Sequence, residues 1–228
     1  MKINLITKFL SKGILVAFIA ILFTIINCKR DTTSSPTVYS CIPEVNNWVI
    51  ANFNTIQSFT REDFIKLDEA KQRAAYRSLT SESKLKIWRD KLSKEILSSN
   101  SEDERNHILS LLGMTDIKIY SDSTYRNNFV KNAQRWYDEA IQKFNWSKAK
   151  ITLMVSSLYL SDESDNTEGF LKLKSQLEIN PKPDCACHRD IFCATWFVCD
   201  HNANCNYKSS GCGWLWAEDC DGLCTWAK

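Results

Sequence analysis

The sequence predicts a mainly α protein, in which a small helical bundle precedes a small, irregular, disulfide-rich C-terminal module. Three observations support this fold class. Residues 43–160 carry apolar side chains at helical spacing and contain a single glycine, Gly113. Eight of the ten cysteines lie between residues 185 and 224. Between these two regions, residues 180–184 include two prolines, which favour a stiff linker. We therefore predict a helical domain over residues 43–179 and a module over residues 185–228.

The first 27 residues have the features of a signal peptide. Lys2, Lys8 and Lys12 precede an apolar run at residues 14–26 that only Thr24 interrupts. As a helix, this run extends about 20 Å, whereas a bilayer core is about 30 Å thick. It fits the hydrophobic region of an export signal better than a membrane span.

The end of the signal resembles the lipobox of bacterial lipoproteins. Ile25-Ile26-Asn27-Cys28 places a cysteine directly after the apolar run, although Asn27 stands where this motif usually has Gly, Ala or Ser. The resemblance implies that Cys28 is lipidated and becomes the mature N-terminus. Residues 28–42 then form a flexible tether. We expect an exported protein, either a membrane-anchored lipoprotein of the cell envelope or a secreted one.

Charge excludes one class of partner. Without residues 1–27 the chain has 26 basic and 27 acidic residues, a net charge of −1. A near-neutral chain has no electrostatic attraction for nucleic acid.

Local signals mark the helix starts. Thr60 with Asp63 forms a capping box before Phe64, whose helix includes Ala74 and Ala75, and Ser101 with Glu104 forms another. Thr80 or Ser81 begins the helix between them. The helix from Ser101 is expected to end at Gly113.

Apolar stripes predict which helical residues are buried. One stripe contains Phe129, Ala133, Trp136, Ala140, Ile141 and Phe144. Residues 149–160 favour a buried helix, although residues 151–158 could form a strand by composition. Ile117–Tyr120 is the other candidate for a strand. A short helix is expected at 170–177. Trp88, Trp136 and His107, the last without an evident partner, are interpreted as core residues.

The cysteines of the module predict four disulfide bonds. An even number in an exported chain indicates a disulfide framework, whose pairing cannot be chosen among 105 possibilities. The eight are Cys185, Cys187, Cys193, Cys199, Cys205, Cys212, Cys220 and Cys224. Zinc is disfavoured because paired C-x2-C or H-x3-H spacings are absent. We expect no metal site and no cofactor, and interpret His188 and His201 as surface residues. Cys41 is either a buried thiol or part of an intermolecular bridge.

The module contains more large apolar side chains than about 44 residues can bury. Exposed aromatic residues beside polar groups are typical of binding surfaces. We predict a target-binding face formed by Trp196, Trp214, Trp216 and Trp226. The alternative is that these residues form a small core and a surface that docks on the helical domain.

The module resembles fulvocin C, and the chain is similar to the bacteriocin fulvocin C-related proteins. The resemblance lies in Cys185-Ala186-Cys187, in the stretch Gly211-Cys212-Gly213-Trp214-Leu215-Trp216 and in Cys220-Asp221-Gly222-Leu223-Cys224. It implies antibacterial activity at the envelope of competitors. Residues 184–228 carry three basic and six acidic residues, so membrane insertion would depend on tryptophan rather than on charge.

No enzyme motif is present. The sequence has no G-x-S-x-G, no H-E-x-x-H and no phosphate-binding glycine loop. The first prediction is therefore an exported bacteriocin-like protein whose released module acts on a bacterial envelope or surface receptor. The alternative is a cell-surface lipoprotein whose module binds a protein or glycan and is never released.

Overall fold

The structure is a computed structural model that describes residues 38–161, 183–193 and 197–226. These residues belong to one compact unit, Pro36–Lys228. The predicted signal peptide, Cys28, the helix at 170–177 and Trp196 lie outside the described residues, as do the side chains of Phe197 and Trp226.

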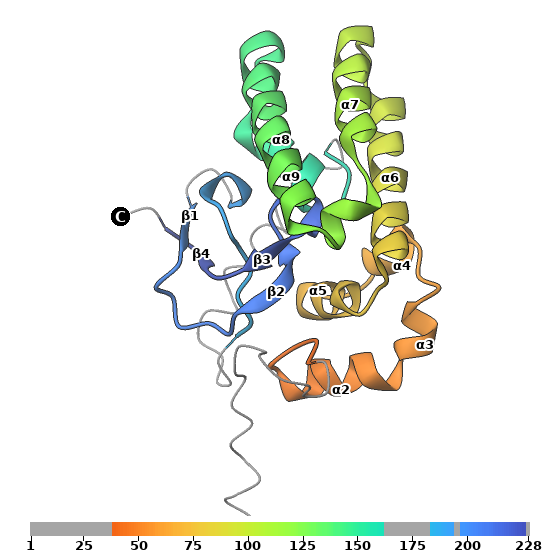
Figure 1. The fold of residues 1–228 in the computed structure, drawn as a ribbon, viewed down its shortest axis with the longest axis vertical. Helices are drawn as coiled ribbons and strands as arrows, with labels where there is room; N and C mark the ends of the chain where they lie inside the picture. The colour runs from red at the N-terminus through yellow and green to blue at the C-terminus, as the bar shows by residue number, and fades with distance from the viewer. Residues whose placement is uncertain (1–37, 162–182, 194–196, 227–228) are drawn as a thin grey trace, which may run out of the picture. The chain divides into compact units, whose positions relative to one another are not determined.

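The described part of the chain is mainly α and ends in a disulfide-rich region, as predicted (Figure 1). Its helices and strands are α2 (Pro43–Ala51), α3 (Phe53–Ile56), α4 (Arg61–Phe64), α5 (Glu69–Arg77), α6 (Ser81–Ser98), α7 (Glu102–Met114), η1 (Ile117–Tyr120), α8 (Ser123–Phe144), α9 (Lys148–Ser156), η3 (Asp190–Phe192), β1 (Phe197–Asp200), β2 (Lys208–Cys212), η4 (Trp214–Trp216), β3 (Glu218–Cys220) and β4 (Leu223–Trp226). Elements labelled η are 3-10 helices.

Side chains cap the helices at the predicted positions. Thr60 and Asp63 form the capping box of α4, and the hydroxyls of Thr80 and Ser101 accept from backbone amides of α6 and α7. These contacts satisfy amides that have no partner within the helix. Helix α7 continues one residue beyond Gly113.

Two predictions about local structure were wrong. The helix expected from Arg61 through Ala75 is two helices, because Asp68 caps a new helix by accepting from the Lys71 amide. Ile117–Tyr120 forms a 3-10 helix rather than a strand, and Asp116 caps it. Residues 148–156 are helical, as favoured for this segment.

Most of the predicted core residues are buried, but Ile141 of the predicted stripe is 38% exposed and Phe144 is only partly buried. Trp88 and Trp136 are 0% and 3% exposed. His107 is also in the core, but it has partners: its ring stacks on Trp136 at 4.7 Å, and its Nε2 lies 3.0 Å from the Trp136 carbonyl oxygen. Burial lowers the pKa of His107 because the charged imidazolium loses its hydration. Among the described residues, no helix combines the length and apolar character that a bilayer crossing requires.

The C-terminal module contains two small antiparallel sheets. Strand β1 pairs with β4, with Cys199 opposite Cys224, and β2 pairs with β3. The module is therefore less irregular than predicted. Strand β2 lies beside α5 (Figure 1).

The module and the helices share a hydrophobic core. Trp214, Leu215, Trp216 and Ala217 belong to the same buried cluster as the apolar residues of the helices. The predicted boundary at residues 180–184 therefore does not separate two independent cores. Two residues at the end of the predicted tether are ordered, because the backbone amides of Tyr39 and Ser40 donate to the Asn46 side chain.

Candidate functional site at the junction of module and helices

All eight cysteines of the module form disulfides, as predicted. The pairs are Cys185–Cys205, Cys187–Cys199, Cys193–Cys224 and Cys212–Cys220. Cys41 is not the buried thiol considered from the sequence, because it also takes part in a disulfide, and its partner lies outside the described residues. These bonds indicate an exported protein, because disulfides persist in oxidising compartments. They also stabilise a module that is too small to depend on its own core.

The stretch Gly211-Cys212-Gly213-Trp214-Leu215-Trp216 forms a buried loop. Gly211 and Gly213 have positive φ angles of 102° and 66°, and Leu215 and Trp216 follow with φ angles of 51° and 53°. A left-handed backbone is strained for residues with side chains, so surrounding contacts must hold it. The loop places Trp214, Leu215 and Trp216 against the helices.

Trp214 and Trp216 are not a target-binding face, contrary to the prediction. They are 0% and 2% exposed. The Trp216 ring packs edge-on against Tyr76 of α5 at 5.0 Å and Trp88 of α6 at 5.9 Å. Trp214 lies edge-on to Phe192 at 5.3 Å. For Trp214 and Trp216 the alternative prediction agrees with the structure: both side chains pack in a core shared with the helices.

Polar groups of the helices also hold the buried loop. The hydroxyls of Tyr76 and Tyr120 both donate to the Leu215 carbonyl oxygen, at 3.2 and 3.3 Å. The indole nitrogen of Trp216 donates to the Ser156 carbonyl oxygen at 2.7 Å. Desolvation raises the pKa of both tyrosines, so they remain neutral donors at physiological pH.

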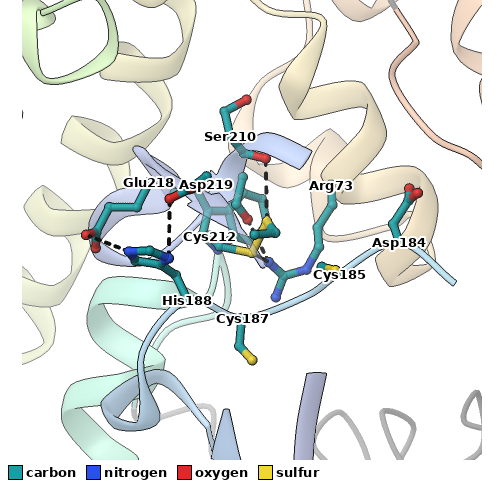
Figure 2. The surroundings of a disulfide bond; sticks show 12 residues. Arg73, Asp184, Cys185, Cys187, His188, Ser210, Cys212, Glu218 and Asp219 are labelled. Atoms are coloured by element: carbon teal, nitrogen blue, oxygen red, sulfur yellow. Dashed lines mark hydrogen bonds and ion pairs between the residues drawn. A yellow bond between two sulfur atoms is a disulfide. The ribbon is translucent and has the colours of Figure 1, made fainter. Parts of the chain in front are cut away.

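Two arginines of α5 bind the backbone of β2. Arg73 donates to the Gly211 carbonyl oxygen at 2.6 Å and Arg77 to that of Ser210 at 3.0 Å. The Arg73 guanidinium also lies 5.1 Å from the centre of the Trp216 ring, within the range of a cation–π interaction. Figure 2 shows Arg73 beside the Cys212 disulfide.

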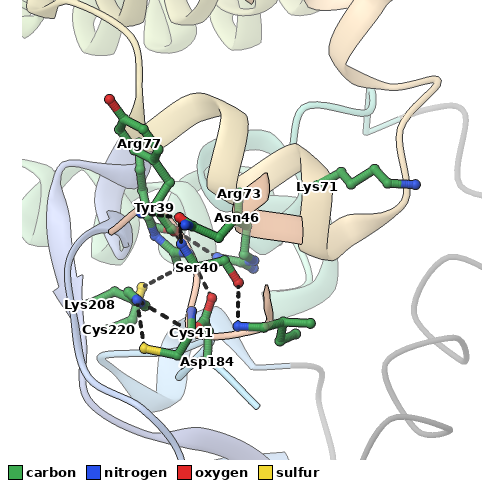
Figure 3. Close-up of polar contacts among 12 residues, drawn as sticks. Tyr39, Ser40, Cys41, Asn46, Lys71, Arg73, Arg77, Asp184, Lys208 and Cys220 are labelled. Carbon is green, nitrogen blue, oxygen red and sulfur yellow. Dashed lines mark hydrogen bonds and ion pairs between the residues drawn. The ribbon is translucent and has the colours of Figure 1, made fainter. Parts of the chain in front are cut away.

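Arg77 connects three separate parts of the chain (Figure 3). Besides Ser210, it binds the Tyr39 carbonyl oxygen at 3.0 Å and Asp184 at 3.3 Å. Desolvation is the largest effect on its pKa, which falls to about 10, and Asp184 opposes this change. Arg77 therefore stays charged at neutral pH.

Asp184 fixes the start of the module. One carboxylate oxygen accepts from the Cys41 amide at 2.9 Å and lies 3.6 Å from the Lys208 ammonium group, and the other pairs with Arg77. The residue that was predicted to end the linker is thus only 12% exposed and held from three sides. Sequence inspection missed this junction because Asp184 and Arg77 are distant in the chain.

A small pocket lies at the same junction. Its volume is about 70 Å³, and Arg73, Arg77, Asp184 and Leu223 are among its lining residues. Pockets for small organic ligands typically exceed about 300 Å³. The junction is therefore suited to holding the module in place rather than to enclosing such a ligand.

Two large apolar side chains of the module are exposed among those that the structure describes. Val198 and Tyr207 are each 37% exposed. Trp196 and the Trp226 side chain, the other members of the predicted face, lie outside the described residues. No family model, no curated protein and no solved structure matches the chain.

Proposed function

We propose that the chain is an exported protein of the cell envelope whose disulfide-bonded module acts while attached to the helices, as a binding module for a protein or glycan. The observation that carries this proposal is the burial of Trp214 and Trp216 in the core formed with the helices. A module held in this way contributes its remaining surface to binding.

The energetics favour a permanent attachment. Truncating one buried tryptophan typically costs about 3–5 kcal/mol, and the module inserts two. Removing the module would also break the hydrogen bonds that the Arg77 side chain, 6% exposed in the intact protein, donates to Ser210 and Asp184. Cleavage of the chain near residue 181 would therefore leave the two parts associated.

A bacteriocin made in a latent form is the second candidate. The Gly-Cys-Gly-Trp-Leu-Trp stretch that resembles fulvocin C is covered by the helices, so the intact chain cannot present Trp214 and Trp216 to a membrane. Release would expose Trp214 and Trp216 and free the strained backbone at Leu215. In this version the helices protect the producing cell until the module is cut free.

Controlled cleavage distinguishes the two candidates. A protease recognition sequence inserted between Asn180 and Pro181 is cut in the oxidised, folded protein, and a scrambled insert of equal length is the control. We expect the fragments to co-elute in native size-exclusion chromatography, to separate only in denaturant, and not to inhibit indicator bacteria. A module that elutes alone contradicts attachment, and growth inhibition by that fraction would establish the latent bacteriocin.

Anchoring at Cys28 is a separate part of the proposal. A sulfur atom that carries a lipid cannot also form a disulfide with Cys41. Peptide mapping of the native protein without reduction, together with metabolic labelling by a fatty acid, determines which modification Cys28 carries. A labelled Cys28 makes the protein a lipoprotein, and an unlabelled Cys28 bonded to Cys41 makes it a secreted protein.

A further inference from the structure

A cluster of histidine and carboxylate side chains lies on the module, away from the buried loop. His188 Nδ1 is 3.2 Å from an oxygen of Asp219 and 3.2 Å from an oxygen of Asp221. The three ligand atoms all lie within 4.8 Å of one another. Figure 2 shows the His188 ring between Asp219 and Glu218. The three side chains are 23–34% exposed, so solutes can reach them.

Disulfides and backbone pairing hold this cluster together. His188 follows Cys187, and Asp219 and Asp221 flank Cys220. Cys187 forms an isolated antiparallel bridge with Gly222, and the Asp221 amide donates to the Cys187 carbonyl oxygen at 3.0 Å. The Cys187–Cys199 and Cys212–Cys220 bonds fix both segments covalently. The side chains are therefore preorganised.

The distances from the His188 nitrogen to the two carboxylate oxygens are close to the spacing of ligand atoms around a small divalent ion. Zinc binds nitrogen and oxygen ligands at about 2.0–2.2 Å in a tetrahedron, which puts neighbouring ligand atoms about 3.3–3.6 Å apart. We propose that His188, Asp219 and Asp221 form a binding site for a divalent transition-metal ion of the Zn²⁺ class. One neutral imidazole and two carboxylates balance the double positive charge of the ion, which also relieves repulsion between the carboxylates.

Two further groups lie beside the three ligands. His201 Nδ1 lies 3.1 Å from the same Asp221 oxygen, at 51% exposure, but it belongs to a separate group of neighbouring ligand atoms and is not counted among the ligands. Glu218 Oε1 lies 3.8 Å from the other ring nitrogen of His188. This distance is longer than a hydrogen bond, so Glu218 contributes negative charge near the imidazole rather than a fixed orientation. Glu218 is itself held by Arg189 at 2.7 Å.

A second group of possible ligands does not form a site. Cys199, His201 and Asp221 also lie close together. The Cys199 sulfur is bonded to Cys187, however, and a disulfide sulfur is not the thiolate that zinc binds. The imidazole and the carboxylates are therefore the ligands of the proposed site.

Titration calorimetry with Zn²⁺ alone tests the proposal on the oxidised mature chain. We expect one ion bound per chain, with affinity at least about tenfold weaker in His188→Ala and in the double variant Asp219→Asn/Asp221→Asn. Asp200→Asn, a carboxylate of the same module outside the three-ligand cluster, is the matched control and should bind as the wild type does. Near-UV circular dichroism and intact mass establish that each variant is folded with its disulfides formed.

The opposing results are equally specific. The proposal is overturned if the folded wild type takes up no Zn²⁺ at 100-fold excess of the ion over about 1 μM protein, a concentration at which typical protein zinc sites fill. It is also overturned if both ligand variants keep wild-type affinity, or if Ca²⁺ binds more tightly than Zn²⁺, since calcium prefers oxygen ligands alone. Loss of affinity in Asp200→Asn equal to that in His188→Ala would likewise contradict it.

Discussion

The Leu215 carbonyl oxygen is a single atom on which the buried loop depends. Leu215 and Trp216 adopt left-handed backbone conformations, each of which costs on the order of 1–3 kcal/mol. The hydroxyls of Tyr76 and Tyr120 hold this carbonyl, and Tyr76 also accepts from the Trp88 indole nitrogen at 3.0 Å. Tyr76 is thus the centre of a buried network that links two helices to the module.

Tyr76→Phe should therefore destabilise the protein more than Tyr120→Phe. Losing the Tyr76 hydroxyl leaves the buried Trp88 nitrogen without its acceptor, at a cost of about 1–3 kcal/mol. Losing that of Tyr120 leaves Leu215 with one donor and should cost about 0.5–1.5 kcal/mol. Urea unfolding of the oxidised proteins measures both values. Equal losses would contradict a central role for Tyr76.

Lys84 gives the stability of the protein a distinctive pH dependence. Desolvation, followed by the charges of Arg77 and Arg126, lowers the pKa of Lys84 from 10.5 to about 8. Between pH 8 and 10 the unfolded chain therefore keeps a proton that the folded chain has lost. Unfolding then takes up a proton, so the contribution of Lys84 to stability rises with pH across this window and is least favourable below pH 8.

Lys84→Met should remove this dependence. We expect the variant to be more stable than the wild type at pH 7, with a difference that shrinks towards pH 10. Urea midpoints of both proteins at pH 7, 8, 9 and 10 give this difference. The contributions of the other titrating groups are the same in both proteins and cancel when the two are subtracted. Lys86→Met, at an exposed position of the same helix, is the control. A difference that stays constant with pH would contradict the assignment.

The turn between β2 and β3 requires glycine at position 213. Gly213 has φ 66° and ψ −154°, a conformation that side chains rarely allow. A Cβ atom there would lie 2.7 Å from the Glu218 Cβ atom and overlap its carboxylate. That carboxylate accepts from the Trp214 amide at 3.1 Å, so any displacement reaches the buried loop directly.

Gly213→Ala should therefore cost more than about 3 kcal/mol or produce wrongly paired disulfides. Gly113→Ala is the matched control, because it lies in helix α7 with no atom within 4 Å of the added Cβ. It should stabilise the protein by about 0.5–1 kcal/mol. Urea unfolding and disulfide mapping compare the two. Similar effects at both sites would show that the turn tolerates a side chain.

Elements whose signals are local could be predicted from the sequence. The hydroxyl caps at Thr60, Thr80 and Ser101 lie beside the helices that they begin, and Trp88 and Trp136 follow the helical period. The strands of the module could not be predicted, because they have three to five residues each and the disulfides help to set their pairing. The even number of cysteines predicted the bonds but not the partners.

The relation between the module and the helices could not be predicted either. Trp216 contacts Tyr76, which lies 140 positions earlier in the chain, and no periodic sequence pattern predicts such a contact. His188 meets Asp219 and Asp221 through the pairing of Cys187 with Gly222 and through the disulfides of the two segments. Trp214 and Trp216 therefore suggested an exposed face, although the helices bury both side chains.

A shared core implies that the helices and the module unfold together. Trp216 contacts Tyr76 of α5 and Trp88 of α6 and donates to the Ser156 carbonyl oxygen at the end of α9. In the oxidised protein we expect far-UV circular dichroism, which follows the helices, and near-UV circular dichroism, which follows the aromatic core and disulfides, to give one urea midpoint.

Trp216→Ala should lower both midpoints together, with a loss of about 3–5 kcal/mol. Trp48→Ala is the control, because Trp48 in α2 is only partly buried and outside the junction, and its loss should be smaller. If Trp216→Ala moved only the near-UV transition and left the helical one in place, the module would be a separate folding unit. Its release by cleavage would then be energetically accessible, and the latent bacteriocin would replace permanent attachment as the better account.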